Sequence, residues 1–447
     1  MNFYPMRKRL SIDALSYPLI CLSCLLVYTP VVFLDFQRAW DDGWMVMNHY
    51  TVMGFTWDNL RAVFTDFYAA QYGPINEVIY MAIYATFGYN PVVYHLYPLL
   101  LHLVNACLVL LFVQQLIEEY IDKVTARRIA FATALLFAIH PLQVESIAWI
   151  SASKIPLYTF FALLFLLTYI RYARTGKIGF YLGSFLLFVC SFGSKEQSVI
   201  LPLLLPLIDW VLNRTPFACG ENPVKNKVTK QSWVYLFLEK APFVLFSLFA
   251  GLYTYTNQSA SIIERWAGYP IGQRMVFAGY SLVEYLGHLV FPIKLLYLYP
   301  FPMAPGKEMP AGLFIYPVIT VAAAIVLMKI LKRQNWPVIF GILFFLINMA
   351  LMLHLIAMSR FSIMADRYVY LPSVGIFFIA AWYAVPWLQK VVANGKNWIF
   401  VLVACYLLYL GGYAHFRTYV WKDDKTLKKE FKELIDVDLL KQSLHDL

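Results

Sequence analysis

Long apolar stretches separated by short polar ones run along almost the whole chain. The first apolar stretch covers 14–34 and follows a basic start with Arg7, Lys8 and Arg9. This stretch is too long for the apolar part of a signal peptide, and no small-residue cleavage site is evident. We therefore expect a first membrane-spanning helix that is not removed.

Ten further apolar stretches approach the length of a membrane span, which needs about 20 residues. They cover 92–117, 129–141, 155–172, 178–192, 198–212, 241–256, 313–331, 338–358, 371–388 and 398–415. Basic clusters lie between them, and such clusters favour the cytoplasmic side of a membrane. If every cluster is cytoplasmic, the N-terminus is cytoplasmic and the C-terminus is on the other side. The pattern predicts an all-α polytopic membrane protein with about eleven transmembrane helices.

Three segments depart from this alternation. The mixed-polarity stretch 35–91 predicts a first outer loop with interfacial helices, including one near 75–87. The apolar segment 276–300 needs both of its ends outside, so we expect a helical hairpin or re-entrant element broken at Pro292. The polar, helix-forming tail 416–447 leaves 1–415 as a single membrane domain.

Composition and charge narrow the class of protein. Hydrophobic residues make up 61% of the 447 residues and charged residues 14%, against about 45–50% and about 25% in soluble domains. These values exclude an ordinary soluble enzyme, a disordered protein and a nucleic-acid-binding module. The net charge of +10 is explained by basic cytoplasmic loops, so the expected environment is a membrane and nucleic acid is not an expected partner.

The predicted topology gathers ionisable residues on the outer face, where such residues are costly and usually functional. Asp41 and Asp42 offer a general base or ligands for a divalent cation, although Asp-Asp-Gly is also common in turns. Lys154, Lys195 and Arg367 offer positive charge for a phosphate, or extend to lipid headgroups.

Five other polar residues are weaker candidates for this face. His140 and Glu145 lie five residues apart, which is too few ligands and not a zinc spacing. Glu196 follows a lysine directly and is a candidate to neutralise it. His95 and His102 share one helix face, and they either bond to neighbouring helices or line a cavity.

The order of the motifs resembles a known family. The motifs are Asp41-Asp42, Tyr72-Gly73-Pro74, Asn90-Pro91, Tyr94-His95, His102 with Asn105, the block FAIHPLQVESIAWIS at 137–151, Ser194-Lys195-Glu196 and the block DRYVYLPS at 366–373. Together they resemble the membrane O-mannosyltransferases with transmembrane and tetratricopeptide-repeat regions, in the glycosyltransferase C superfamily. The resemblance extends from about residue 35 to 425.

This resemblance implies a glycosyltransferase that moves a sugar from a polyprenyl-phosphate donor to a protein, glycan or lipid acceptor on the non-cytoplasmic face. The bacterial inner membrane is the expected location. The resemblance assigns the catalytic base, or a metal ligand, to Asp41 or Asp42, and the donor phosphate to Lys154, Lys195 and Arg367. No cofactor beyond a divalent cation is expected.

Two departures from the family pattern matter. The family's acid after the Ala-Trp block is replaced by Ile155, so this chain offers no carboxylate there. The repeats do not follow the membrane part, which favours a glycan or glycolipid acceptor.

The physical chemistry of such a donor agrees with the pattern. A prenyl tail stays in lipid, while its sugar phosphate reaches the headgroup level, where a base and cations are needed. A single displacement would invert the anomeric carbon. A transporter or flippase for a lipid-linked or amphipathic solute is the main alternative, although no inverted repeat is present. A polymerase or ligase of lipid-linked glycans is a third hypothesis, and a membrane scaffold would not explain the charges on one face.

Overall fold

The computed structural model describes residues 12–68, 71–215, 231–257, 269–355 and 362–434. Within these ranges the chain consists of helices, loops and two isolated β-bridges. The predicted helical tail is present as α17 (Asp424–Leu434), and its last part, 435–447, lies outside the described residues.

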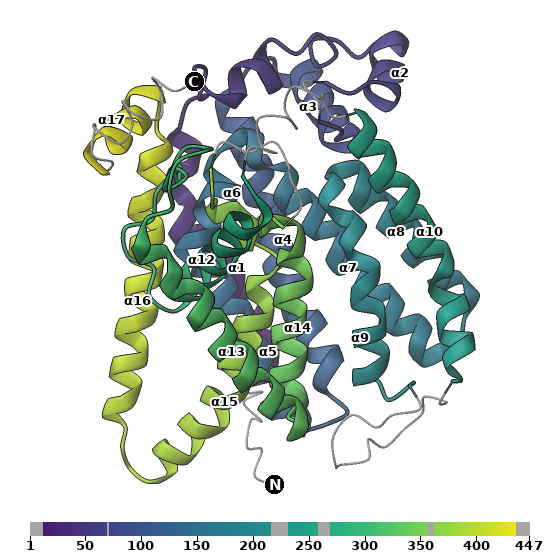
Figure 1. The fold of residues 1–447 in the computed structure, drawn as a ribbon, viewed down its shortest axis with the longest axis vertical. Helices are drawn as coiled ribbons and strands as arrows, with labels where there is room; N and C mark the ends of the chain where they lie inside the picture. Colours follow the sequence, from purple (N-terminus) through teal and green to yellow (C-terminus); the bar gives the residue numbers. More distant parts are fainter. Residues whose placement is uncertain (1–11, 69–70, 216–230, 258–268, 356–361, 435–447) are drawn as a thin grey trace, which may run out of the picture.

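The longer helices form one bundle (Figure 1). They are α1 (Ile12–Tyr28), α4 (Pro91–Ile117), α5 (Lys123–Ile139), α7 (Lys154–Thr175), α8 (Ile178–Ser194), α10 (Trp233–Asn257), α12 (Ile271–Val290), α13 (Ile315–Lys332), α14 (Trp336–Met349), α15 (Ser373–Ala393) and α16 (Trp398–Thr418). The short helices are α2 (Trp57–Thr65), α3 (Pro74–Phe87), α6 (Val144–Ala148) and α9 (Leu204–Val211). The tighter or wider turns that matter for the site are η2 (Gly43–Met47), η4 (Ile150–Ala152), η5 (Glu196–Leu203) and η8 (Asp366–Val369).

Seven helical segments of the described chain are long and apolar enough to cross a membrane. They are Leu15–Phe33, Pro91–Ile117, Ile150–Thr175, Trp233–Asn257, Ala311–Lys332, Ser373–Ala393 and Trp398–Trp421. The pair Lys123–Ile139 and Pro141–Ala148, bent by 57°, can provide an eighth. The predicted number of about eleven is reached only if the shorter α8 and α14 and the amphipathic α12 are included.

The outer surface of these helices is apolar. Leu245 on α10, Val318 on α13 and Leu408 on α16 are 64%, 63% and 74% exposed, and no residue of α13 is buried. Exposed apolar surface on this scale is unstable in water but matches the hydrocarbon of a bilayer. The chain is therefore an integral membrane protein of all-α class.

Two predicted segments have a different local structure. The stretch 198–212 is divided between η5 and α9, because Pro202 and Pro206 each remove a backbone donor from a regular helix. The stretch 276–300 is not a helical hairpin, so that alternative is wrong, whereas the alternative of a re-entrant element stays a prediction. α12 ends at Val290, before Pro292, and the chain then runs irregularly until Tyr299 accepts a backbone hydrogen bond from Ile363 at 2.9 Å.

The centre of the bundle is formed by α4, α5, α7 and α15, with α8 against α7 and α14 against α15. α14 and α15 approach closely at two glycines. A Cβ built on Gly341 would overlap the carbonyl oxygen of Gly375, and one built on Gly375 would overlap that of Gly341. Small residues allow such backbone contact between membrane helices.

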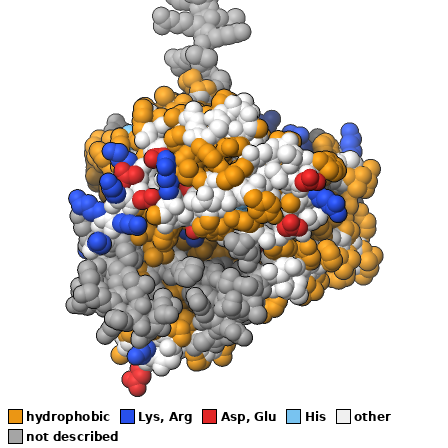
Figure 2. Space-filling view, turned by 90° about the horizontal axis from the view of Figure 1, so that it is seen from above, with side chains coloured by type: hydrophobic (Ala, Val, Ile, Leu, Met, Phe, Trp, Pro, Cys, Tyr) orange, Lys and Arg blue, Asp and Glu red, His pale blue; other side chains and the backbone are white. Residues whose placement is uncertain are grey.

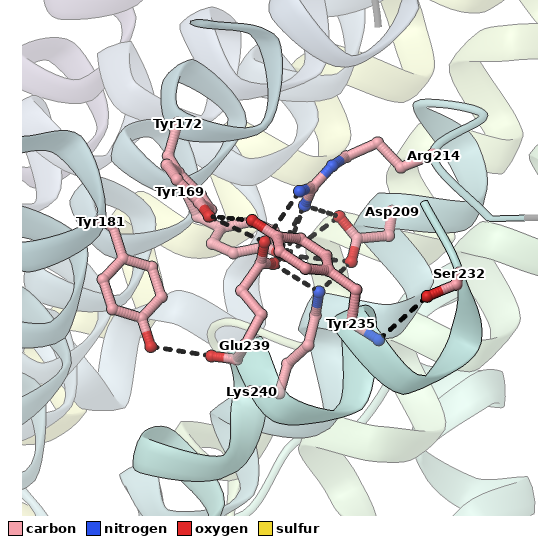
Figure 3. A network of polar contacts seen from close by, with 9 residues as sticks. All are labelled: Tyr169, Tyr172, Tyr181, Asp209, Arg214, Ser232, Tyr235, Glu239 and Lys240. Carbon is pink, nitrogen blue, oxygen red and sulfur yellow. Dashed lines mark hydrogen bonds and ion pairs between the residues drawn. The ribbon is translucent and has the colours of Figure 1, made fainter. Parts of the chain in front are cut away.

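A buried network of charged residues joins α7, α9 and α10 (Figure 3). Arg214 contacts Asp209 and Glu239, both at 2.8 Å, and Lys240 contacts the same two carboxylates. The hydroxyl of Tyr169 donates to Asp209 at 3.0 Å. Two acids and two bases balance, so each buried charge has an opposite partner.

The buried charge network is separated along the helix axis from the end of the bundle that carries Lys154. Tyr169 follows Lys154 by fifteen residues on α7, which places it about 22 Å along the helix axis. The helices α2, α3 and α17 lie at one end of the molecule (Figure 1), and Lys154 lines a pocket together with residues of α3. Figure 2 looks onto this end, where acidic and basic side chains are interspersed with apolar surface.

Candidate active site

The segment that carries the aspartate pair is held in place by the residues that follow α16. The backbone N–H of Asp35 donates to the carbonyl of Lys422 at 3.0 Å, and the side-chain amide of Gln37 donates to the backbone carbonyl of Trp421 at 2.7 Å. The turn at Gly43 is equally constrained, because a Cβ there would overlap the carbonyl oxygen of residue 38. The glycine of Asp-Asp-Gly therefore permits a close backbone approach.

Asp42 is buried, and its carboxylate is occupied by protein donors. One oxygen accepts from the backbone N–H of Gln37 at 2.9 Å. The other accepts from the backbone N–H of Ser151 at 2.9 Å and from its hydroxyl at 2.5 Å. Burial raises the pKa of Asp42 to about 6, although these three hydrogen bonds oppose the shift. Asp42 thus joins the first outer loop to η4.

Asp41 has the opposite environment, although it is the neighbouring residue. It is partly exposed, and the indole N–H of Trp44 donates to one of its oxygens at 3.1 Å. Its charge acts on Lys154 and on Arg367. Of the two predicted acids, Asp41 is the one with access to the surface and to the cations.

Lys154 is the centre of the charged group. It lies at the first position of α7, and the charges that act on it are, in decreasing order, those of Lys195, Glu196, Asp41 and Arg367. Its ammonium donates to the side chain of Gln71. The structure thus brings together residues that are separated by up to 326 positions in the sequence, as the topology predicts.

Arg367 is held by an acid and by aromatic rings. Its side chain pairs with Glu145, whose side chain is 2% exposed, and its backbone N–H donates to the same carboxylate at 2.8 Å. The guanidinium carbon lies 5.0 Å from the ring centre of Trp149 and 4.8 Å from that of Tyr368. A planar cation fits both kinds of contact. Glu145 therefore orients Arg367 rather than pairing with His140.

The three predicted histidines lie between helices, away from this charged group. His102 contacts the hydroxyl of Tyr370 at 2.7 Å and the carbonyl of Ala138 at 3.1 Å. His140 accepts from the backbone N–H of Leu142 at 3.3 Å and is completely buried, and His95 is 1% exposed. None of the three lines the pocket described next; His102 and His140 make hydrogen bonds, and His95 is buried by packing.

A small polar pocket beside Lys154 contains residues that the sequence analysis missed. Its lining comprises Trp44, Met45, His49, Tyr68, Gln71, Tyr72, Gly73, Asn76, Glu77, Tyr80, Lys154 and Glu196. Glu77 is the most important addition, because burial raises its pKa to about 7 despite the charge of Lys154. The available signal was one carboxylate inside the otherwise apolar stretch 75–87.

The acidic residues do not form a protein-built metal centre. Both oxygens of Asp42 accept from protein donors, which leaves Asp41 as the accessible carboxylate of the pair. Across the described ranges, no group of three or more His, Cys, Asp or Glu side chains is placed to hold a metal ion. A divalent cation at Asp41 or Asp42 stays a prediction.

Comparison with known proteins finds a sequence match over part of the chain. No protein-family model matches the chain. A stretch of 98 residues is 38% identical to the human protein O-mannosyl-transferase TMTC1 and covers 22% of this chain and 10% of that protein. The matched region is thus about a tenth of the relative's length.

Two solved structures show a distant similarity to this chain. They are the oligosaccharyltransferase of Archaeoglobus fulgidus in the apo form and the same enzyme tethered to an acceptor peptide containing the NVT sequon. The TM-scores are 0.43 and 0.42, each with 14% identity, and each covers 94% of this chain and 56% or 55% of the other. At these scores neither likeness bears on the site.

Proposed function

We propose that this protein is a membrane glycosyltransferase that takes a sugar from a polyprenyl-phosphate donor. One observation carries the proposal: the accessible carboxylate of Asp41 interacts with Lys154 and Arg367, and Lys195 interacts with Lys154, in a chain with several apolar helices long enough to span a membrane. The local match to a protein named as an O-mannosyl-transferase supports the same reaction class.

The charges suit the bonds that must change. The acceptor hydroxyl attacks the anomeric carbon, and Asp41 takes its proton. The bond between that carbon and the phosphate oxygen breaks, and its electron pair stays on the phosphate. The phosphate gains one negative charge as the phosphodiester becomes a monoester, so cations that stabilise this developing charge lower the barrier. A single displacement inverts the anomeric centre.

Each cation has a separate part in this scheme. Arg367 is fixed by Glu145 and the aromatic rings, so its fork presents planar donors with little loss of freedom. Lys154 interacts with both Asp41 and Lys195 and supplies positive charge to the leaving phosphate. Asp42 does not take part in proton transfer, because it holds η4 against the first outer loop.

Basic residues at the other end of the bundle support the proposed orientation. Lys329 and Lys332 close α13, and Lys390 closes α15. Such residues favour the cytoplasm, which supports a non-cytoplasmic location for the Asp41 end. The acceptor there is a protein, a glycan or a lipid.

The test uses the purified chain in lipid nanodiscs with undecaprenyl-phosphate-[14C]mannose as the probe and a membrane extract as the acceptor source. We expect release of undecaprenyl phosphate together with label in a new product. Asp41→Asn lowers this rate by about 10²- to 10⁴-fold, the usual contribution of a general base, and leaves donor binding intact. The exposed Asp58→Asn is the matched control. Full turnover in Asp41→Asn would remove Asp41 from the mechanism, and no product with mannose, glucose, galactose or N-acetylglucosamine donors would overturn the proposed function.

A further inference from the structure

The pocket beside Lys154 has a chemistry of its own, distinct from that of the cation group. Trp44 and Tyr68 form part of its wall, with ring centres 6.1 Å apart, and the ring of His49 lies 3.6 Å from that of Tyr68. The lining also includes Glu77 and Gln71. Aromatic faces beside a carboxylate and an amide are the combination that contacts both the C–H face and the hydroxyls of a sugar.

Glu77 keeps hydrogen-bonding capacity toward this pocket. Its nearest ionisable partner is His49, at 3.5 Å, which is longer than a good hydrogen bond. The hydroxyl of Thr51 contacts His49 at 2.8 Å and also interacts with the carboxylate of Glu77. A carboxylate has about four acceptor positions, and the side chain of Glu77 is 17% exposed. Its oxygens can therefore accept from a further donor that enters the pocket.

The size of the pocket sets what enters it. It offers space of about 20 Å³ to a water-sized molecule, which corresponds to about one water position. A whole sugar ring does not fit, but a single hydroxyl does. The pocket is supported from behind by Tyr80, whose hydroxyl bonds to Ser153 at 2.6 Å and to the carbonyl of Ile150 at 2.7 Å. This support keeps the pocket narrow.

We propose that this pocket receives one hydroxyl of a sugar ring, with Glu77 as the acceptor and Trp44 and Tyr68 against the ring. The choice of ligand class rests on the proposed glycosyl transfer. The pocket lies next to the reaction centre, because Lys154 lines it and Trp44 bonds to Asp41. A site built around a buried acceptor rejects sugars that lack the matching hydroxyl, so Glu77 would determine sugar specificity.

The experiment measures binding and does not require turnover. Saturation-transfer NMR on the full chain in nanodiscs uses the methyl glycosides of mannose, glucose, galactose and N-acetylglucosamine as probes. We expect at least one glycoside to bind, with the strongest transfer concentrated at one ring position. Glu77→Ala and Trp44→Phe should weaken that binding, the first by about tenfold to a hundredfold because a hydrogen bond to a charged group is lost. Asp58→Asn should bind like the wild type.

The outcomes separate this inference from the proposed function. Glycoside binding that follows this pattern supports the proposed hydroxyl pocket even if no sugar transfer is found. Sugar transfer without such binding supports the proposed function and contradicts the hydroxyl pocket. Displacement of the glycoside by undecaprenyl-phosphate mannose identifies the donor sugar as the occupant, and persistence of the signal identifies a sugar of the acceptor. Three results would overturn the inference: no glycoside binds, binding is unchanged in Glu77→Ala, or undecaprenyl phosphate without sugar displaces it equally well.

Discussion

Replacement of Asp42 by asparagine tests whether this residue is a buried structural acid. In the folded protein burial raises the pKa of Asp42 to about 6, from 3.8. One pKa unit corresponds to about 1.4 kcal/mol, so ionising Asp42 costs the folded state about 3 kcal/mol relative to the unfolded chain. The wild type is therefore most stable below about pH 4 with respect to this group, and loses this contribution as the pH rises through about 6.

The Asp42→Asn side chain does not ionise, so the free energy of unfolding of the variant lacks this dependence on pH. Its amide also places an N–H opposite a backbone or hydroxyl donor, which costs about 1–3 kcal/mol at every pH. Because this amide cost does not depend on pH, the test compares how the free energies of unfolding of the variant and the wild type change with pH. We expect Asp42→Asn to gain about 3 kcal/mol relative to the wild type between pH 4 and pH 7.

The assay is reversible unfolding of the purified protein in mixed micelles, followed by tryptophan fluorescence at several pH values. Asp58→Asn, on exposed α2, is the control and should track the wild type. A free-energy difference between Asp42→Asn and the wild type that stays constant from pH 4 to pH 7 would refute the assignment of Asp42 as a buried, high-pKa acid.

Three further predictions address packing, buried charge and donor binding. Gly341→Ala forces apart two helix backbones that already touch and should destabilise the protein by about 1–3 kcal/mol or more. The control is Gly412→Ala on α16, which has no neighbour within 4 Å and should be neutral. Equal thermal stability of the two variants would disprove the close contact. Arg214→Met leaves two buried carboxylates with Lys240 as their one cation, so one negative charge is uncompensated. This should cost about 3–5 kcal/mol in unfolding in detergent, unlike the exposed Arg128→Met. A small loss would mean that the network is hydrated. Arg367→Lys keeps the charge but loses the fork and the aromatic contacts, so the affinity for undecaprenyl-phosphate mannose in a scintillation proximity assay should fall about tenfold; unchanged affinity would leave Arg367 a packing role.

The sequence by itself determined where most helices lie. A run of about 20 apolar residues has few stable conformations other than a membrane helix, because every backbone group must be bonded within the segment. The stretches predicted at 92–117 and 155–172 therefore appear as α4 and α7 with small changes at their ends. The helical hairpin predicted for 276–300 is not found, because hydropathy does not report which backbone groups are hydrogen-bonded to other parts of the chain. Tyr299 is bonded to Ile363, far along the chain.

The candidate residues were visible in the sequence, but their roles were decided by tertiary contacts. Adjacent aspartates look equivalent in a motif, yet Ser151, from another part of the chain, encloses Asp42 and leaves Asp41 accessible. Glu77 stood inside an apolar stretch, and only the packing of α3 beside Lys154 places it in a pocket. Local sequence fixes backbone preference and polarity, whereas burial and charge depend on residues hundreds of positions away, and burial and charge are what give these carboxylates different chemistry.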